Sequence, residues 1–222
     1  MSRVPFPDVT GRRLRAPSRT SFAGDGMASL GHASMNATNI TWKDLHEAAQ
    51  DFGVSPRAII SAAWGYVLYL YVAHECDNVA FDAVDGDTCV AISFGPSLCR
   101  WGDPISMVQL SEKAWLSDRH VPIHGPVLFV SAPDQDTQSA LSLAESTLSR
   151  TNSSLSLVFI AHQAHTSTSS SSSHPVALTL LASPSVHIHG SAMTQLAQVE
   201  HVLHALVHRL DPVSYTHLTL PT

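Results

Sequence analysis

Apolar residues recur with helical spacing directly after a polar start signal at residue 41. Thr41 and Asp44, three residues apart, resemble a capping box, which marks the beginning of a helix. Gly53 supplies the left-handed residue that commonly ends one. The apolar residues between these two signals fall on one helical face. They are Trp42, Leu45, Ala49 and Phe52.

A second helix is predicted to follow at once. Ser55 is a suitable cap and Pro56 a suitable first helical residue, and an apolar run continues to about Ala73. Because this run is hydrophobic almost all round, the helix should be buried on most sides. Its longest apolar stretch, about 16 residues and interrupted by Ser61 and Gly65, is shorter than the roughly 20 residues that a bilayer span needs. A membrane span is therefore not predicted.

The rest of the chain alternates between strand and helix patterns. Strands are predicted at 78–84, 126–132, 154–162, 175–182 and 186–190, and helices at 105–116, 137–150 and 191–210. Residues 88–104 read as irregular. The apolar stripe of the last helix comprises Leu196, Val199, Leu203, Leu206 and Leu210. The fold class predicted from this pattern is mixed α and β (α/β, in the α+β arrangement), with long helices covering one mixed sheet.

Composition narrows the classes of protein. The chain has 222 residues, enough for one or two domains, and 44% of them are hydrophobic, enough for a core. A formal charge of −6 is unsuited to a phosphate-binding surface, so nucleic acid is not expected as a partner. The first 15 residues lack the apolar segment of a signal peptide, and we expect a cytoplasmic protein.

Three cysteines, Cys76, Cys89 and Cys99, are an odd number without CxxC spacing. This pattern argues against a disulfide framework or a structural zinc knot. No GxSxG nucleophile motif occurs in the sequence. Gly24-Asp25-Gly26 is not a phosphate-binding loop, because no strand precedes it. We therefore assign no catalytic and no cofactor-binding residue.

The histidines near the C-terminal end are candidate metal ligands. His201, His204 and His208 share one face of the last predicted helix, and the last two have the i,i+4 spacing of a metal-binding pair. This face lies opposite the leucine stripe, so these side chains should be solvated. His187 and His189 would point the same way from a strand. A metal-binding protein would need all five to converge, and we assign no metal ligand.

Asp82, Asp85 and Asp87 around Gly86 faintly resemble a calcium loop. No glutamate follows at the required distance. We interpret the group as a turn with solvated carboxylates.

The ends of the chain differ from its middle. Residues 1–40 read as a connecting or irregular segment, and residues 41–212 as the domain, with a serine-rich surface loop at 166–173. The last ten residues, 213–222, read VSYTHLTLPT and match the translation of an adapter used in sequencing libraries. We therefore exclude them from the fold, and we expect the natural protein to be longer than this chain.

The segment 51–84, DFGVSPRAIISAAWGYVLYLYVAHECDNVAFDAV, resembles the second half of the condensation domain of nonribosomal peptide synthetases, particularly the fungal type. The residues in step with the family pattern are Gly53, Val54, Ala62, Ala63, Trp64, Val67, Leu68, Tyr71, Val79 and Phe81. Residues 195–203, QLAQVEHVL, resemble the helix that closes such domains. Between them, Leu98, Arg100 and residues 103–110 loosely resemble a third family passage.

The resemblance implies a two-lobed fold of the chloramphenicol-acetyltransferase (CoA-dependent acyltransferase) type, of which this chain would be the C-terminal lobe. Members of the family join carrier-bound aminoacyl or peptidyl thioesters by amide formation, around an HHxxxDG motif on the N-terminal lobe. That motif is absent from this chain, so it would be inactive alone. The implied partners are the missing N-terminal lobe and the carrier and adenylation domains of the same synthetase, with phosphopantetheine carried by the partner carriers.

One departure from the family pattern leaves an alternative open. Asp85-Gly86-Asp87 stands where the family has serine-glycine-arginine. A degenerate, non-catalytic condensation-like module for domain docking would tolerate such losses.

Overall fold

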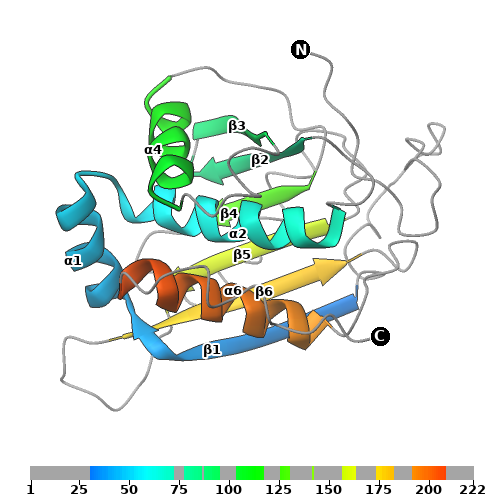
Figure 1. Ribbon diagram of the computed structural model, residues 1–222. Coiled ribbons are helices and arrows are strands. Elements are labelled where there is room, and N and C mark those ends of the chain that lie inside the picture. The colour runs from blue at the N-terminus through cyan, green and yellow to red at the C-terminus, as the bar shows by residue number, and fades with distance from the viewer. Residues whose placement is uncertain are drawn as a thin grey trace, which may run out of the picture.

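The computed structural model describes a mixed six-stranded sheet with helices packed on it (Figure 1). The described residues are 31–72, 78–86, 88–95, 104–117, 126–130, 142, 157–163, 174–182 and 192–208. The strands are β1 (Gly31–Thr41), β2 (Val79–Asp85), β3 (Thr88–Phe94), β4 (Val127–Val130), β5 (Leu157–Gln163) and β6 (Pro175–Ala182). The helices are α1 (Trp42–Phe52), α2 (Pro56–Val72), α4 (Pro104–Trp115) and α6 (Ala192–Val207).

Strand order in the sheet is β1-β6-β5-β4-β2-β3. The three central strands β2, β4 and β5 run parallel, and antiparallel neighbours flank them on both sides. Parallel strands need a crossover connection, and α4 lies on the chain between β2 and β4. The mixed α+β class expected from the sequence is confirmed.

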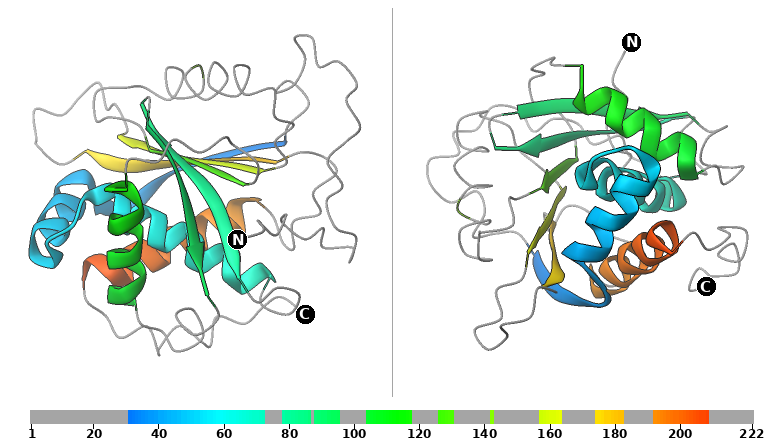
Figure 2. Two further views of the ribbon diagram at one scale, coloured as in Figure 1. Left: turned by 90° about the horizontal axis from the view of Figure 1, so that it is seen from above. Right: turned by 90° about the vertical axis from the view of Figure 1, so that its left-hand side faces the viewer.

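The four described helices, α1, α2, α4 and α6, lie on the same side of the sheet (Figure 2). α2 crosses its middle and contacts β2, β4 and the other three helices. Among the residues of α2 whose burial is described, the buried side chains are those of Ala58, Ile59, Ile60, Ser61, Ala62, Ala63, Trp64, Val67, Leu68 and Tyr69. The predicted burial of α2 on most sides is confirmed, and it explains why its apolar residues show no single-sided pattern.

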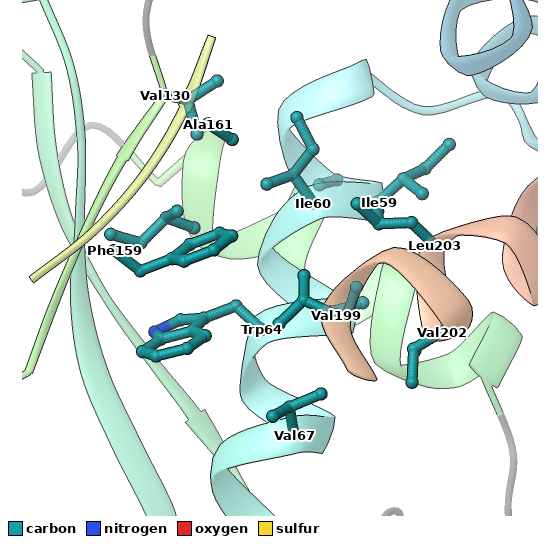
Figure 3. Close-up of a cluster of buried hydrophobic side chains, with 14 of the residues drawn as sticks. Ile59, Ile60, Trp64, Val67, Val130, Phe159, Ala161, Val199, Val202 and Leu203 are labelled. Carbon is teal, nitrogen blue, oxygen red and sulfur yellow. The ribbon is translucent and has the colours of Figure 1, made fainter. Parts of the chain in front are cut away.

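The core between α2 and the sheet is built around two aromatic rings. Trp64 of α2 stacks on Phe159 of β5, with ring centroids 4.5 Å apart and planes 7° from parallel (Figure 3). Val199 and Leu203 of α6 are fully buried beside α2. All four described residues of the predicted stripe of α6 are buried, namely Leu196, Val199, Leu203 and Leu206.

The sheet is also buried on the face away from the helices. Strand register places Val127 and Phe129 of β4 beside Val158 and Ile160 of β5 on that second face. All four side chains are almost completely buried. Strands buried on both faces read as continuous apolar runs rather than alternating ones, and LVFI in β5 and VLFV in β4 have this character.

Local signals for α1 are confirmed in detail. The Asp44 backbone N–H donates to Thr41 Oγ1 at 3.2 Å, and the Thr41 N–H donates to Asp44 Oδ2 at 2.8 Å, which completes the capping box. Gly53 has φ 67°, and the Val54 N–H donates to the Ala49 carbonyl at 2.9 Å. A glycine is required there because other residues rarely adopt this conformation.

Two segments interpreted as irregular are strands in the structure. Residues 31–41 form β1, which pairs antiparallel with β6. The sequence of this strand, with Ala33, Ser34, Met35, Asn36 and Ala37, is only weakly typical of a strand. The strand it pairs with, β6, lies more than 130 residues further along the chain. Within 88–104, residues Thr88–Phe94 form β3, whose alternation buries Val90, Ile92 and Phe94 against the helices.

Several sequence predictions lie outside the described residues. These are the helix at 137–150 apart from residue 142, the strand at 186–190, the serine-rich loop at 166–173, most of the segment 1–40 and the tail 213–222. The domain boundaries at 41 and 212 stay predictions. The helix predicted at 105–116 and the strand at 126–132 are confirmed as α4 and β4.

Candidate functional site

The histidines of α6 are the first candidates. His201 and His208 are exposed and His204 is half-buried, so the predicted solvated face is confirmed for two of the three. The rings of His204 and His208 lie close together, with centroids 4.4 Å apart and planes tilted by 54°. The His208 N–H donates to the His204 carbonyl at 3.0 Å, which keeps helical spacing to the end of α6.

The electrostatic surroundings of His204 favour its neutral form. Burial lowers the pKa of His204 below 6.5, and the neighbouring His208 and His201 lower it further, while Glu200 opposes them. His187 and His189 lie outside the described residues, so their convergence on α6 stays untested. Within the described residues, no group of three or more His, Cys, Asp or Glu side chains is arranged to hold a metal.

The aspartate group near Gly86 is not a solvated turn, and that interpretation was wrong. Asp82 lies within β2 and is only 2% exposed, because β2 is an inner strand between β3 and β4. Asp85 ends β2 and pairs with Arg57 of α2 at 3.1 Å. Asp87 lies outside the described residues, and Gly86 has φ 56°, as the short β2–β3 connection requires.

Arg57 connects three elements at the N-terminal end of α2. Its guanidinium lies 4.7 Å from the centroid of the Trp115 ring in α4, while Nη1 donates to Asp85 of β2. The indole Nε1–H of Trp115 donates in turn to Ser61 Oγ at 3.1 Å. These contacts fix α4 and the β2–β3 hairpin against α2, which is a structural role for the aspartate.

Two further carboxylates, which the sequence analysis did not single out, bind backbone groups of distant segments. Glu112 of α4 accepts from the Ser55 N–H at 3.0 Å and from its hydroxyl at 2.5 Å, at the start of α2. Glu200 of α6 accepts from the Thr38 N–H at 2.6 Å, its hydroxyl at 3.0 Å and the Asn39 N–H at 3.3 Å. No local sequence motif predicts these hydrogen bonds, because 57 residues separate Ser55 from Glu112 and more than 160 separate Thr38 from Glu200.

Glu200 binds where the ladder between β1 and β6 is irregular. The register shifts between Asn36 and Thr41, so the backbone there departs from regular pairing with β6. The carboxylate of Glu200 satisfies two N–H groups at this irregularity. It thereby holds the edge strand β1 against α6.

One of the three cysteines lies among the described residues. It is Cys89, half-buried on β3, whereas Cys76 and Cys99 lie outside the described residues. The printed sequence contains no two consecutive histidines, so the HHxxxDG motif is not in this chain. Within the described residues, the carboxylates of Asp85, Glu112 and Glu200 therefore have structural roles.

Comparison with known proteins bears on the fold. No family model and no curated protein matches this sequence. Solved structures do match. The cyclization-docking bidomain of the synthetase EpoB from Sorangium cellulosum is 13% identical over 91% of this chain and 45% of its own, with a TM-score of 0.58. The first condensation domain of the calcium-dependent antibiotic synthetase is 12% identical over 94% of this chain and 50% of its own length, with a TM-score of 0.57.

A third match extends the set beyond peptide synthetases. The condensation domain of the Monacolin K polyketide synthase MokA is 11% identical over 93% of this chain and 53% of its own, with a TM-score of 0.52. This chain has the condensation-domain fold. The acyltransferase-type fold expected from the sequence is confirmed, and the chain spans about half the length of these solved structures.

The structure also bears on the membrane question. None of the described helices is both long and apolar enough to cross a bilayer.

Proposed function

We propose that this chain is the C-terminal lobe of a nonribosomal peptide synthetase condensation domain. The observation that carries the proposal is the asymmetry of coverage. The solved condensation domains account for 93–94% of this chain, whereas it accounts for only 50–53% of them. A single lobe of a two-lobed domain has this relation to the whole.

The position of the family-like residues supports the same proposal. The segment 51–84 contains α2 and β2, including Trp64 stacked on Phe159, and residues 195–203 lie in α6, which packs on α2. The resemblance in sequence therefore falls on residues that pack together.

The proposed chemistry is amide formation by the whole domain. The amine of one carrier-bound aminoacyl group attacks the thioester carbonyl of the other, the C–N bond forms, the C–S bond breaks, and the phosphopantetheine thiol leaves with the proton. The HHxxxDG histidine of the N-terminal lobe would orient or deprotonate the amine. This chain would supply one wall of the cleft, and carrier and adenylation domains of the same cytoplasmic synthetase would be its partners.

The test starts with genomic sequence on both sides of the reading frame. The extended protein is then expressed with its two flanking carriers, each loaded with a different aminoacyl-phosphopantetheine, and the dipeptidyl carrier is sought by mass spectrometry. We expect an HHxxxDG segment upstream and product formation. The control replaces the second histidine of that motif by alanine and should abolish product.

A second candidate is a non-catalytic module that docks carrier domains. The observation that favours it is Asp85 in place of the family serine, because Asp85 is engaged with Arg57 as a structural pair. An extended frame with two lobes but no HHxxxDG, which binds loaded carriers without forming product, would establish this function. A frame with no second lobe would overturn both candidates.

A further inference from the structure

The end of α6 carries a pair of histidines that the condensation chemistry does not use. We propose that His204 and His208 form a site for one borderline divalent cation of the Zn²⁺, Cu²⁺ and Ni²⁺ class. The ion would be held by one nitrogen from each imidazole, with water in the remaining positions.

Geometry is the first argument. The two ring centroids are 4.4 Å apart, and the hydrogen bond from the His208 N–H to the His204 carbonyl holds the residues at i,i+4 spacing. Two histidines at this spacing on one helix face can chelate a single ion. His208 is exposed and His204 is partly exposed, so a hydrated cation can reach both rings.

The charge of the surroundings is the second argument. His204 lies in the last turn of α6 and His208 directly follows its last residue, Val207, where the unpaired carbonyls give the helix end a partial negative charge that attracts cations. Two protonated imidazoles this close would repel each other, whereas one shared cation would not.

The ligand type decides which cations fit. Imidazole suits Zn²⁺, Cu²⁺ and Ni²⁺, whereas Mg²⁺ and Ca²⁺ prefer oxygen. The described residues bring no third side chain into a metal-binding arrangement with this pair. His201, one turn earlier on the same exposed face, is therefore assigned no ligand role and serves as the matched control.

The experiment measures Zn²⁺ binding to the full chain, purified without a histidine tag, by competition with a chromophoric zinc indicator at pH 7.5. Because the chain has 14 histidines, the comparison between variants isolates the site. We expect His204→Gln and His208→Gln each to weaken the tightest binding step by about tenfold or more. His201→Gln and the exposed His46→Gln of α1 should bind like the parent.

A second measurement follows thermal unfolding. Since the ion binds the helix and not the unfolded chain, Zn²⁺ should raise the Tm of the parent and of His201→Gln, whereas Mg²⁺ should not. His204→Gln should fold, as judged by circular dichroism, but lose the Zn²⁺-dependent shift. Unchanged affinity in the two variants, or equal loss in His201→Gln, would overturn the two-histidine site.

Discussion

Gly65 of α2 packs so closely against Phe94 of β3 that a methyl group on Gly65 would overlap the phenylalanine ring. The same methyl group would lie 3.0 Å from Cε1 of Phe81 on β2. Phe94 and Phe81 are both buried and lie ring to ring, with centroids 6.1 Å apart. The absence of a side chain at Gly65 is therefore what lets α2 approach the β2–β3 hairpin.

Replacing Gly65 by alanine should destabilise the fold. Overpacking costs about 1–3 kcal/mol, and the better helix propensity of alanine offsets up to about 1 kcal/mol. We expect a net loss of about 1–2 kcal/mol in the free energy of unfolding, measured by urea denaturation followed through tryptophan fluorescence. In a Phe94→Leu background, which frees space above the helix, the loss should be smaller. An equal loss in both backgrounds would show that the ring is not the obstacle.

Removing the carboxylate of Glu200 should loosen β1. Glu200→Ala leaves the N–H groups of Thr38 and Asn39 without their acceptor. Both residues are exposed, so water can replace part of the interaction, and we expect a loss of about 1 kcal/mol, the typical net contribution of a hydrogen bond. Glu200→Gln keeps an acceptor oxygen and should recover part of the loss. The control is Glu47→Ala, whose ion pair with Lys43 is exposed and should contribute at most about 0.5 kcal/mol. Similar losses at Glu200 and Glu47, in the same urea assay, would contradict the assignment.

Ser55 and Glu112 should behave as one interaction. Glu112→Ala removes the acceptor for both the hydroxyl and the N–H of Ser55, and Ser55→Ala removes the hydroxyl alone. In a double-mutant cycle we expect a coupling free energy of about 0.5–3 kcal/mol, since the residues are in direct contact. Additive losses would mean that the contact does not stabilise the junction of α2 and α4.

Acidification should cost stability through His204. Its folded-state pKa lies below 6.5, so the unfolded chain binds the proton first as the pH falls through 6.5. The free energy of unfolding is therefore higher at pH 7.5 than at pH 5, because it falls progressively as the pH drops below 6.5. In His204→Gln, the difference between urea midpoints at pH 7.5 and 5.5 should be smaller than in the parent. An identical difference would show that His204 does not contribute to it.

Predictions from local sequence succeeded wherever the signal and the structure lie within a few residues of each other. The capping box at Thr41, the left-handed Gly53 and the start of α2 near Ser55 depend on neighbours only, and all three are observed. The edge strands β1 and β3 were missed. Small alternating residues carry a weak local preference, and pairing with β6 or β2 decides their conformation.

For the candidate site residues, too, predictions from nearby sequence were correct and a prediction that depended on distant segments was wrong. The exposed histidine face of α6 follows from the leucine stripe, because helical spacing alone places the two on opposite sides. Asp82 was misplaced in a solvated turn. Asp82 is buried because β2 lies between β3 and the distant β4 in the sheet. Residues near Asp82 in the sequence do not predict this strand order.

The sequence by itself determined the helix boundaries, the apolar faces and the resemblance to a condensation domain, because each depends on residues close together in the chain. Tertiary structure alone decided the strand order, the fit of Gly65 under Phe94 and the reach of Glu112 and Glu200 to distant backbone groups. These depend on contacts between segments 29 to more than 160 residues apart, whose formation rests on the packing of the whole core rather than on any local preference.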